Sequence, residues 1–213
     1  RIFAGSNSFS LIAIPFFILA GNIMNNGGIA TRLVNCAKVI SGRMPGALAQ
    51  SNVVANMLFG AISGSGAAAA AAMGGTIGPL EEKEGYDKNY STAVNVASAP
   101  VGMLIPPSNT MIVYSSVAGS VSIAALFMAG YIPGLLWGGA VMILAGIMAK
   151  KRGYQAEQRV PVKVALKTFW QAIPSLLLIV IVIGGILGGI FTATEGSAIA
   201  VVYATVLSLI YKA

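Results

Sequence analysis

The sequence of 213 residues contains no histidine and only one cysteine, Cys36. A single thiol excludes a disulfide bond within the chain and a cluster of thiolate metal ligands. The absence of histidine disfavours haem and most zinc sites. Charged residues make up only 9% of the chain, whereas a soluble domain has roughly 25%. The sequence also shows no nucleophile–base pair, so we do not expect an enzyme.

The chain is rich in apolar residues: 56% of it is hydrophobic, and its mean hydropathy is +0.82. Apolar runs recur near the length of about 20 residues that a helix needs to cross a bilayer. We therefore expect an all-α polytopic membrane protein, and the net charge of +7 indicates membrane topology rather than an affinity for nucleic acid. The expected apolar helices cover residues 9–24, 123–149, 168–190 and 193–211, with a weakly amphipathic helix at 29–40.

Two shorter apolar arms in residues 47–80 predict a re-entrant helical hairpin rather than a crossing helix. If this segment enters and leaves the membrane on one side, twelve of the thirteen basic residues share that side and only Arg1 falls on the other. This distribution follows the positive-inside rule and places the hairpin ends in the cytoplasm. A single crossing would split the basic residues between the two sides. The twelve are Arg32, Lys38, Arg43, Lys83, Lys88, Lys150, Lys151, Arg152, Arg159, Lys163, Lys167 and Lys212.

The turn of this hairpin is predicted within FGAISGSGAAAAAAMGG, where hydroxyls and glycines interrupt the apolar sequence. Irregular backbone at membrane depth is tolerated only inside protein or beside water. The tip of a helical hairpin leaves unpaired carbonyls at the end of the first helix and unpaired amides at the start of the second. The carbonyls suit a cation and the amides suit an anion. Ser63 and Ser65 add hydroxyl oxygens, while Gly64 and Gly66 allow close approach of the backbone. The alternative is that small residues only allow tight helix packing, which fits residues 67–72 better than the tip.

A second interruption lies in the apolar segment 91–120, where SAPVGMLIPPSNT contains three prolines. Pro100, Pro106 and Pro107 each remove a helical hydrogen bond and disfavour helix at the preceding residue. We expect the helix to unwind here and to restart at Ser108, which can act as an N-cap. The alternative is a structural kink with a simple cap. Paired interruptions in neighbouring segments are typical of a transporter site at the middle of the membrane.

No Asp, Glu, Lys, Arg or His lies inside the expected spans, and Glu195 stands at the outer end of the last one. Proton relays use titratable groups inside the membrane, so coupling to Na⁺ through neutral oxygens is the better hypothesis. Glu195, in FTATEG, is expected to stabilise the start of the last helix together with a neighbouring threonine. The acidic segment 81–87 is expected to be a solvated turn.

Five motifs together resemble the large membrane subunit of the tripartite ATP-independent periplasmic (TRAP) transporters of bacteria. They are PFFILAGNIMNNGGIATRLV, GRMPGALAQSNVVANMLFGAISGSGAAAAAAMG, IPPSNTMIVYSSVAG, LFMAGYIPGLL and GIFTATEGSAIAVVYA, in the order of the family and over nearly the whole chain. The resemblance implies an inverted-repeat fold of the ion transporter superfamily, in which a mobile transport domain moves like an elevator past a static scaffold. It implies import of carboxylates or sugar acids, such as dicarboxylates or sialic acid, across the bacterial inner membrane.

The resemblance also implies Na⁺ as the coupling ion and no organic cofactor. The implied partners are a small membrane subunit, a periplasmic substrate-binding protein, an anionic small-molecule substrate and the lipid bilayer. By resemblance, residues 1–46 are a scaffold helix and a connecting helix, 47–80 and 91–120 are the hairpin and broken helix of the transport domain, and 121–213 are largely scaffold. The family's second hairpin and second broken helix have no match, and the sequence opens at Arg1, so we expect a fragment of a longer protein.

The resemblance matches the hairpin tip and the helix break to a Na⁺ site and to part of the substrate cavity. The expected Na⁺-binding residues are Ser63, Gly64, Ser65, Gly66, Gly102, Ile105, Pro106, Ser108 and Asn109. The expected contacts to the substrate are Ser65, Ser108, Asn109 and Thr110. Many family members carry a polar or acidic residue shortly after the tip, where this chain has only alanines. Two other functions stay open, namely a channel with a carbonyl filter and a membrane-anchoring subunit.

Overall fold

The computed structural model describes residues 9–119, 121–154, 156 and 161–212, and its regular elements are helices throughout this part of the chain. The predicted all-α class is therefore confirmed for these residues. In chain order they are η1 (Phe9–Ile12), a 3₁₀ helix, followed by α2 (Ala13–Asn26), α3 (Ile29–Ser41), α4 (Ala47–Ser63), α5 (Gly66–Thr76), α6 (Gly78–Lys83), α7 (Lys88–Ser98), α8 (Val101–Leu104), α9 (Asn109–Ala118), α10 (Ile123–Lys151), α11 (Val162–Leu187) and α12 (Ala193–Lys212).

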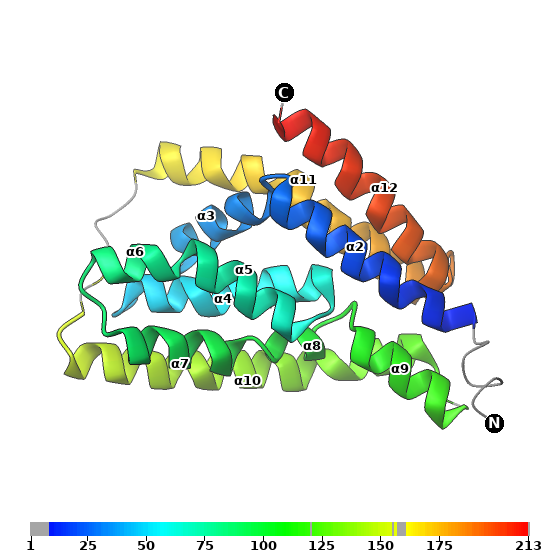
Figure 1. Cartoon of the computed structure of the whole chain (residues 1–213), viewed down its shortest axis with the longest axis horizontal. Coiled ribbons are helices and arrows are strands. Elements are labelled where there is room, and N and C mark those ends of the chain that lie inside the picture. The colour runs from blue at the N-terminus through cyan, green and yellow to red at the C-terminus, as the bar shows by residue number, and fades with distance from the viewer. Residues whose placement is uncertain (1–8, 120, 155, 157–160, 213) are drawn as a thin grey trace.

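The helices form two groups that meet at α4 (Figure 1). In the lower group, α4 and the arm made by α5 and α6 run antiparallel to each other, and α7 and α10 lie alongside them. In the upper group, α2 packs along α12, and α11 contacts both α3 and α12. Because α4 also contacts α2, α3 and α11, it forms the boundary between the groups.

Three helices, α10, α11 and α12, are long and apolar enough to cross a membrane, and the number rises to five if two bent helix pairs each count as one span. The first bent pair joins Ser10–Asn26 to Ile29–Ser41 at 74°, and the second joins Lys88–Leu104 to Asn109–Ala118 at 48°. These helices confirm the expected apolar helices. The boundaries differ most at α11, which begins at Val162 rather than near residue 168.

Large apolar side chains point outward from the long helices. Leu136 of α10 is 69% exposed, Val180 of α11 is 64% exposed and Leu209 of α12 is 67% exposed. In water such a surface would be an aggregation hazard, whereas in a bilayer it faces lipid tails of the same polarity. The exposed apolar surface therefore agrees with a polytopic membrane protein.

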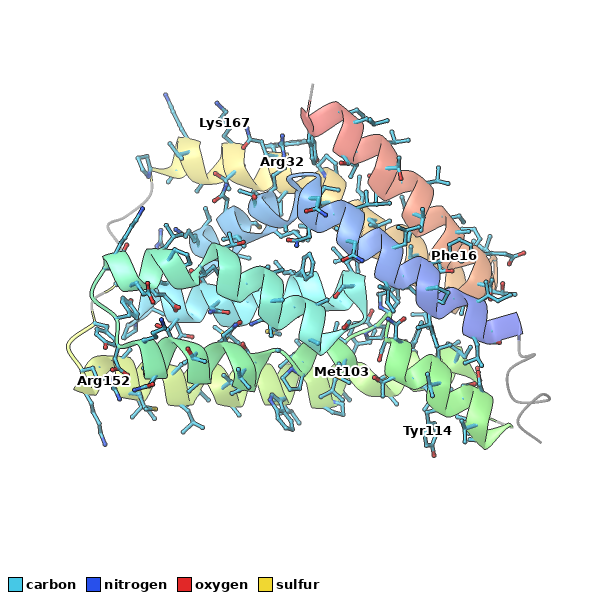
Figure 2. All side chains as sticks on the ribbon, viewed as in Figure 1. Phe16, Arg32, Met103, Tyr114, Arg152 and Lys167 are labelled. Carbon is cyan, nitrogen blue, oxygen red and sulfur yellow. The ribbon has the colours of Figure 1, made fainter. Side chains whose placement is uncertain are left out.

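Figure 2 labels three basic side chains. Arg152 lies at the left end of that view and Lys167 and Arg32 lie along its upper edge, whereas Tyr114 lies at the lower right. The grouping of the basic residues on one side of the membrane stays a prediction.

α10 is attached to the hairpin and to α7 by hydrogen bonds from side chains to backbone carbonyls. Gln50 Nε2 of α4 and the Tyr90 hydroxyl of α7 donate to carbonyls of α10 at 2.9 and 2.8 Å. In the opposite direction, Trp137 Nε1 of α10 donates to the carbonyl of Ala97 at 2.9 Å. Each bond satisfies a polar group in an otherwise apolar contact, so α10 is held to α4 and α7.

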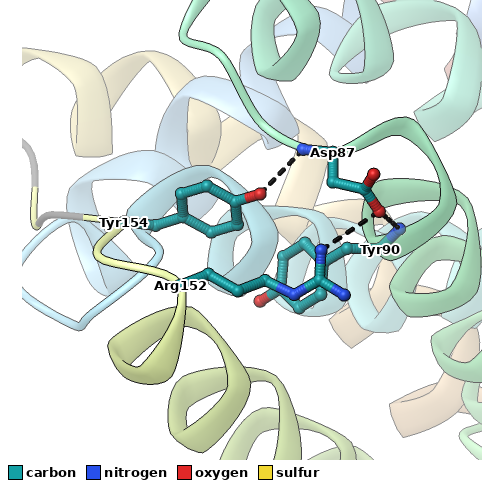
Figure 3. A network of polar contacts seen from close by, with 4 residues as sticks. All are labelled: Asp87, Tyr90, Arg152 and Tyr154. Atoms are coloured by element: carbon teal, nitrogen blue, oxygen red, sulfur yellow. Dashed lines mark hydrogen bonds and ion pairs between the residues drawn. The ribbon is translucent and has the colours of Figure 1, made fainter.

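A polar network closes the end of this group where α7 begins (Figure 3). Arg152 Nη1 lies 3.1 Å from Asp87 Oδ1, and that same oxygen accepts a hydrogen bond of 2.9 Å from the backbone N–H of Tyr90 as N-cap of α7. The backbone N–H of Asp87 donates to the hydroxyl of Tyr154 at 2.8 Å. The Tyr154 ring stacks on Tyr86, with 4.2 Å between the ring centroids. The network joins the end of α10 to the start of α7.

The acidic segment 81–87 departs from the sequence prediction at two buried residues, Glu81 and Tyr86. Glu82 and Glu84 are exposed as expected, but Glu81 is 0% exposed, so the prediction of a solvated turn is wrong there. The physical reason is α6, whose single helical turn after Pro79 directs Glu81 toward the inside of the bundle and its neighbours toward water.

Candidate ion and substrate site

The hairpin turn consists of Gly64 and Ser65, between α4 and α5. Gly64 adopts the left-handed conformation, with φ of 61°, and its N–H donates to the carbonyl of Gly60 at 2.8 Å, which ends α4. Ser65 is extended, and its hydroxyl accepts a hydrogen bond from the N–H of Ala68 at 3.3 Å as the N-cap of α5. The predicted tip is therefore a tight turn with a glycine at the position that needs positive φ.

The predicted break separates α8, which ends at Leu104, from α9, which begins at Asn109. The peptide bond between Pro106 and Pro107 is cis. Ser108 is the N-cap of α9, as predicted, because its hydroxyl accepts from the N–H of Met111 at 3.4 Å. The same hydroxyl donates to the carbonyl of Met103, so one side chain joins the two helices across the break.

Asn109 connects the break to the hairpin tip. Its backbone N–H donates to the carbonyl of Gly64 at 3.4 Å, and its Nδ2 donates to the carbonyl of Ser63 at 3.3 Å. The remaining polar atom, Asn109 Oδ1, is buried and makes no hydrogen bond within the described residues. A buried amide oxygen without a donor loses its interaction with water, so it favours a cation or a water molecule beside it.

Glycines allow the two backbones to come this close. A Cβ atom on Gly60 would lie 2.3 Å from the Cα of Gly102, and a Cβ atom on Gly64 would lie 3.0 Å from the N of Asn109. Both distances are shorter than a normal contact between carbon atoms, or between carbon and nitrogen. The sequence analysis identified Gly64 and Gly102 as site residues but missed Gly60, which stands one helical turn before the tip.

The junction brings helix ends of both polarities to one place. α4 and α8 end here with the partial negative charge of a helix C-terminus, whereas α5 and α9 begin here with the partial positive charge of a helix N-terminus. The carbonyl ends and Asn109 Oδ1 suit a cation, and the amino ends of α5 and α9 suit a carboxylate. Such an arrangement can bind an ion and an anion together without covalent chemistry.

The other predicted site residues lie around this junction in different ways. Ser63 is 1% exposed and Ser108 is 0% exposed, whereas Ser65 is half-buried and Thr110 is exposed. Gly66 lies against α8, since a Cβ atom there would be 3.0 Å from Met103 Sδ.

Ile105 and Pro106 lie in the irregular segment between α8 and α9. The Ile105 side chain lies beside Gly134 of α10, at 2.7 Å from the position of an added Cβ. Only a backbone atom of Ile105 is therefore suitable as an ion ligand, and Pro106 likewise offers only its carbonyl.

A second buried polar group was missed by the sequence analysis. Asn56 Nδ2 lies within hydrogen-bonding distance of Asn52 Oδ1 at 3.0 Å, Asn95 Oδ1 at 2.9 Å and Ser98 Oγ at 2.8 Å. Asn52 and Asn56 stand four residues apart in an apolar arm, and Asn95 and Ser98 stand three apart. That helical spacing of polar residues among apolar ones is the signal that could have revealed them.

The whole chain, residues 1–213, matches the family model described as the tripartite ATP-independent periplasmic transporter, DctM component. Over 212 residues the chain is 56% identical to a Salmonella typhimurium protein described as uncharacterized protein YgiK, with 100% of this chain and 49% of that protein covered. Over 209 residues it is 44% identical to the isethionate TRAP transporter permease protein DctMQ of Oleidesulfovibrio alaskensis, with coverage of 96% and 32%.

Over 226 residues the chain is 38% identical to the C4-dicarboxylate TRAP transporter large permease protein DctM of Rhodobacter capsulatus, with coverage of 100% and 51%. The chain thus spans between about a third and about half of the length of these curated relatives.

Proposed function

The chain belongs to the DctM component family of tripartite ATP-independent periplasmic transporters, and from this premise we propose that it forms part of a Na⁺-coupled importer of an organic acid. It is a multi-pass protein of the bacterial inner membrane. The proposed role is transport without covalent chemistry, so the protein is not an enzyme.

The observation that carries this proposal is the position of Asn109 between the hairpin tip and the helix break. The two hydrogen bonds from Asn109 to the tip are long, at 3.4 and 3.3 Å, and its Oδ1 is buried without a partner. Hydrogen bonds of this length are weak. An ion can therefore bind to the carbonyl oxygens of the tip, because the hydrogen bonds that it would displace are weak.

In the proposed mechanism, Na⁺ binds the carbonyl oxygens at the ends of α4 and α8 together with Asn109 Oδ1. These ligands belong to the hairpin (α4) and to both halves of the broken helix (α8 and α9), so the bound ion holds the hairpin against the broken helix. The organised junction then presents the amino ends of α5 and α9 to the carboxylate of the substrate. Ser65, Ser108 and the exposed Thr110 lie at those ends and are the proposed contacts.

The moving body in this proposal consists of the hairpin, α7, α8, α9 and α10. The hydrogen bonds of Gln50, Tyr90 and Trp137 support the inclusion of α10, because they attach it to α4 and α7. We therefore propose that α10 moves with the transport domain. The family resemblance leads to a different expectation, because it implies that residues 121–213 are largely scaffold. We propose α2, α11 and α12 as the static part of an elevator-type movement.

The names of the relatives support the proposed substrate class. One is named for isethionate and another for C4-dicarboxylates, and both compounds are small organic anions. We propose a carboxylate or sugar acid as the substrate. The proposed partners are a small membrane subunit and a periplasmic substrate-binding protein, as in a tripartite system.

Reconstitution tests this function directly. The full-length protein and its small subunit would be placed in proteoliposomes with the cognate binding protein and radiolabelled dicarboxylates or sugar acids. We expect uptake only with an inward Na⁺ gradient and with the binding protein. Uptake indifferent to Na⁺ would refute the coupling, and uptake without gradient or binding protein would favour a channel.

Asn109→Leu tests the site within that assay, because leucine has a similar volume and no polar atom. We expect this variant to insert in the membrane and to lose Na⁺-dependent uptake. Asn89→Leu is the matched control, since Asn89 is exposed on α7 away from the junction. Normal uptake by Asn109→Leu would remove the site assignment.

A further inference from the structure

A cavity of about 310 Å³ lies among α4, α5, α6 and α7. Figure 1 shows that α6 and the start of α7 lie at the end of the hairpin away from its tip. The cavity has room for an ion and several water molecules. Seven of its ten lining residues have polar or charged side chains. The cavity is lined by Asn52 of α4, Gly74 of α5, Pro79, Glu81 and Glu82 of α6, and Lys88, Ser91, Thr92 and Asn95 of α7, together with Gly78.

Glu81 is the unusual group in this cavity. It is 0% exposed, and neither of its carboxylate oxygens makes a hydrogen bond within the described residues. Two potential donors that also line the cavity, Asn52 Nδ2 and Ser91 Oγ, are likewise buried without hydrogen-bond partners. Both donors lie near enough to the Glu81 carboxyl to lower its pKa, yet none of these atoms makes a hydrogen bond of normal geometry in the part of the chain that the structure describes. Buried polar atoms are almost always paired, so we expect a polar occupant between them.

The charges around the cavity favour a cation. Lys88 Nζ lies 3.4 Å from Glu82 Oε1, so these two exposed charges balance each other at the mouth. The adjoining helices α4 and α5 contain no charged residue. The Tyr90 hydroxyl, another titratable group near Glu81, is engaged in donating to a carbonyl of α10. An ionised Glu81 is therefore the unbalanced charge of the cavity.

Neutral oxygens are also available to complete a coordination shell. Asn56 Nδ2 carries two hydrogens but lies 2.8–3.0 Å from three acceptors, Asn52 Oδ1, Asn95 Oδ1 and Ser98 Oγ. It therefore cannot donate a hydrogen bond to all three at once. The amide oxygens of Asn52 and Asn95 keep the capacity to bind a cation, and the Ser91 hydroxyl adds another oxygen.

We propose that this cavity is a second binding site for a small monovalent cation, Na⁺, with the Glu81 carboxylate and the oxygens of Ser91, Asn52 and Asn95 as ligands. The site is separate from the junction at the hairpin tip and goes beyond the proposed function. Burial raises the pKa of the Glu81 carboxyl to about 7, although the nearby polar side chains of Ser91 and Asn52 lower this pKa. A proton therefore competes with Na⁺ for the same oxygen atoms near neutral pH.

The cavity also lies where an ion could influence the hairpin. Its ligands come from α4, α6 and α7, and Asn95 Nδ2 donates to the carbonyl of Ala70 on α5 at 2.9 Å. A cation bound here holds the base of both hairpin arms against α7. The predicted topology places the mouth of the cavity on the cytoplasmic side, where internal Na⁺ and pH would act on it.

Binding of ²²Na⁺ to the purified full-length transporter, with its small subunit and without substrate, tests the proposal. We expect Glu81→Gln to bind less Na⁺ than the wild type by the equivalent of a single site. Glu84→Gln is the matched control, because Glu84 is exposed in the same segment and does not line the cavity. It should bind as the wild type does.

The pH profile gives a readout that a merely structural glutamate would not produce. The wild type should lose the Na⁺ bound at this site between about pH 8.5 and pH 5.5, while Glu81→Gln should show no such loss. Ser91→Ala, which keeps the charge, should weaken this site several-fold without removing it. It also serves as the test variant if Glu81→Gln does not fold.

The outcomes separate the two proposals. Equal Na⁺ binding by the wild type and Glu81→Gln at both pH values would show that the cavity holds only water and would overturn the inference. Asn109→Leu should lose the other Na⁺ and keep the ion at Glu81. If Asn109→Leu binds Na⁺ as the wild type does while Glu81→Gln does not, the tip assignment fails and the cavity assignment stands.

Discussion

The contact between Gly60 and Gly102 is predicted to hold the hairpin tip against the broken helix, and Gly60→Ala tests it. The added Cβ atom would lie 2.3 Å from the Cα and 3.2 Å from the N of Gly102. Carbon atoms that are not bonded normally stay about 3.5 Å or more apart, so α4 and α8 must separate by roughly 1 Å. Overpacking of this kind costs about 1–3 kcal/mol, and alanine recovers about 0.5–1 kcal/mol of helix propensity.

The same separation should weaken the proposed Na⁺ site. The hydrogen bonds from Asn109 to Ser63 and Gly64 are already 3.3 and 3.4 Å long, so a shift of roughly 1 Å would break them. We expect Na⁺ affinity to fall about tenfold or more, which corresponds to a loss of about 1.4 kcal/mol. The assay is thermal unfolding of the purified full-length transporter at increasing Na⁺ concentrations.

Gly75→Ala is the matched control for this prediction. Gly75 belongs to the same hairpin, and a Cβ atom there would meet no atom within 4 Å. Alanine in helix α5 should therefore raise stability slightly and leave Na⁺ affinity unchanged. An unfolding temperature and Na⁺ affinity for Gly60→Ala equal to those of the wild type would refute the role assigned to the glycine contact.

Three further predictions use the same unfolding assay. Tyr154→Phe removes the hydroxyl that accepts a hydrogen bond from the N–H of Asp87, and should cost about 1 kcal/mol; an unchanged midpoint would contradict this. Thr192→Ala removes half of a capping box, because the Thr192 hydroxyl donates to Glu195 Oε2 at 2.9 Å and accepts from its N–H at 3.3 Å, so it should lower the midpoint modestly. Without Na⁺, wild-type stability should fall as pH rises from about 4.5 toward 7, because folded Glu81 keeps a proton that the unfolded chain releases. Glu81→Gln should lack this fall, and a parallel pH profile would contradict the assignment.

Local backbone chemistry is what the sequence predicts well in this protein. Gly64 and Ser65 predict a turn and a cap from their own conformational preferences, and the prolines before Ser108 predict a break in the same way. The capping of α12 by Glu195 and a neighbouring threonine is confirmed for the same reason, since both groups lie within one helical turn.

Contacts between distant segments could not be predicted from the same rules. The partner of Asn109 is Gly64, 45 positions earlier, and the sequence contains no local signal for that pairing. Glu81 likewise stands in a charged segment whose composition is typical of a solvated turn. Its burial depends on how α6 packs against α4 and α7, which is a tertiary property.

The distribution of buried hydrogen bonds indicates which surface can slide. The contacts of α4 and α7 with α10 include directional bonds from Gln50, Tyr90 and Trp137; the Tyr90 bond is buried, the Gln50 bond is partly buried and the Trp137 bond is exposed. Leaving a buried donor without its partner costs about 1–3 kcal/mol, so the bonds of Tyr90 and Gln50 resist separation most. The contact of α2 with α4 is of another type, because Gly21 packs directly against the Cβ of Ser63. Non-directional packing can be exchanged for similar packing after a shift, whereas a broken hydrogen bond needs a new partner. Movement is therefore expected between α2 and α4 rather than between α4 and α10, and a cross-link between α2 and α4 should stop transport while one between α4 and α10 should not.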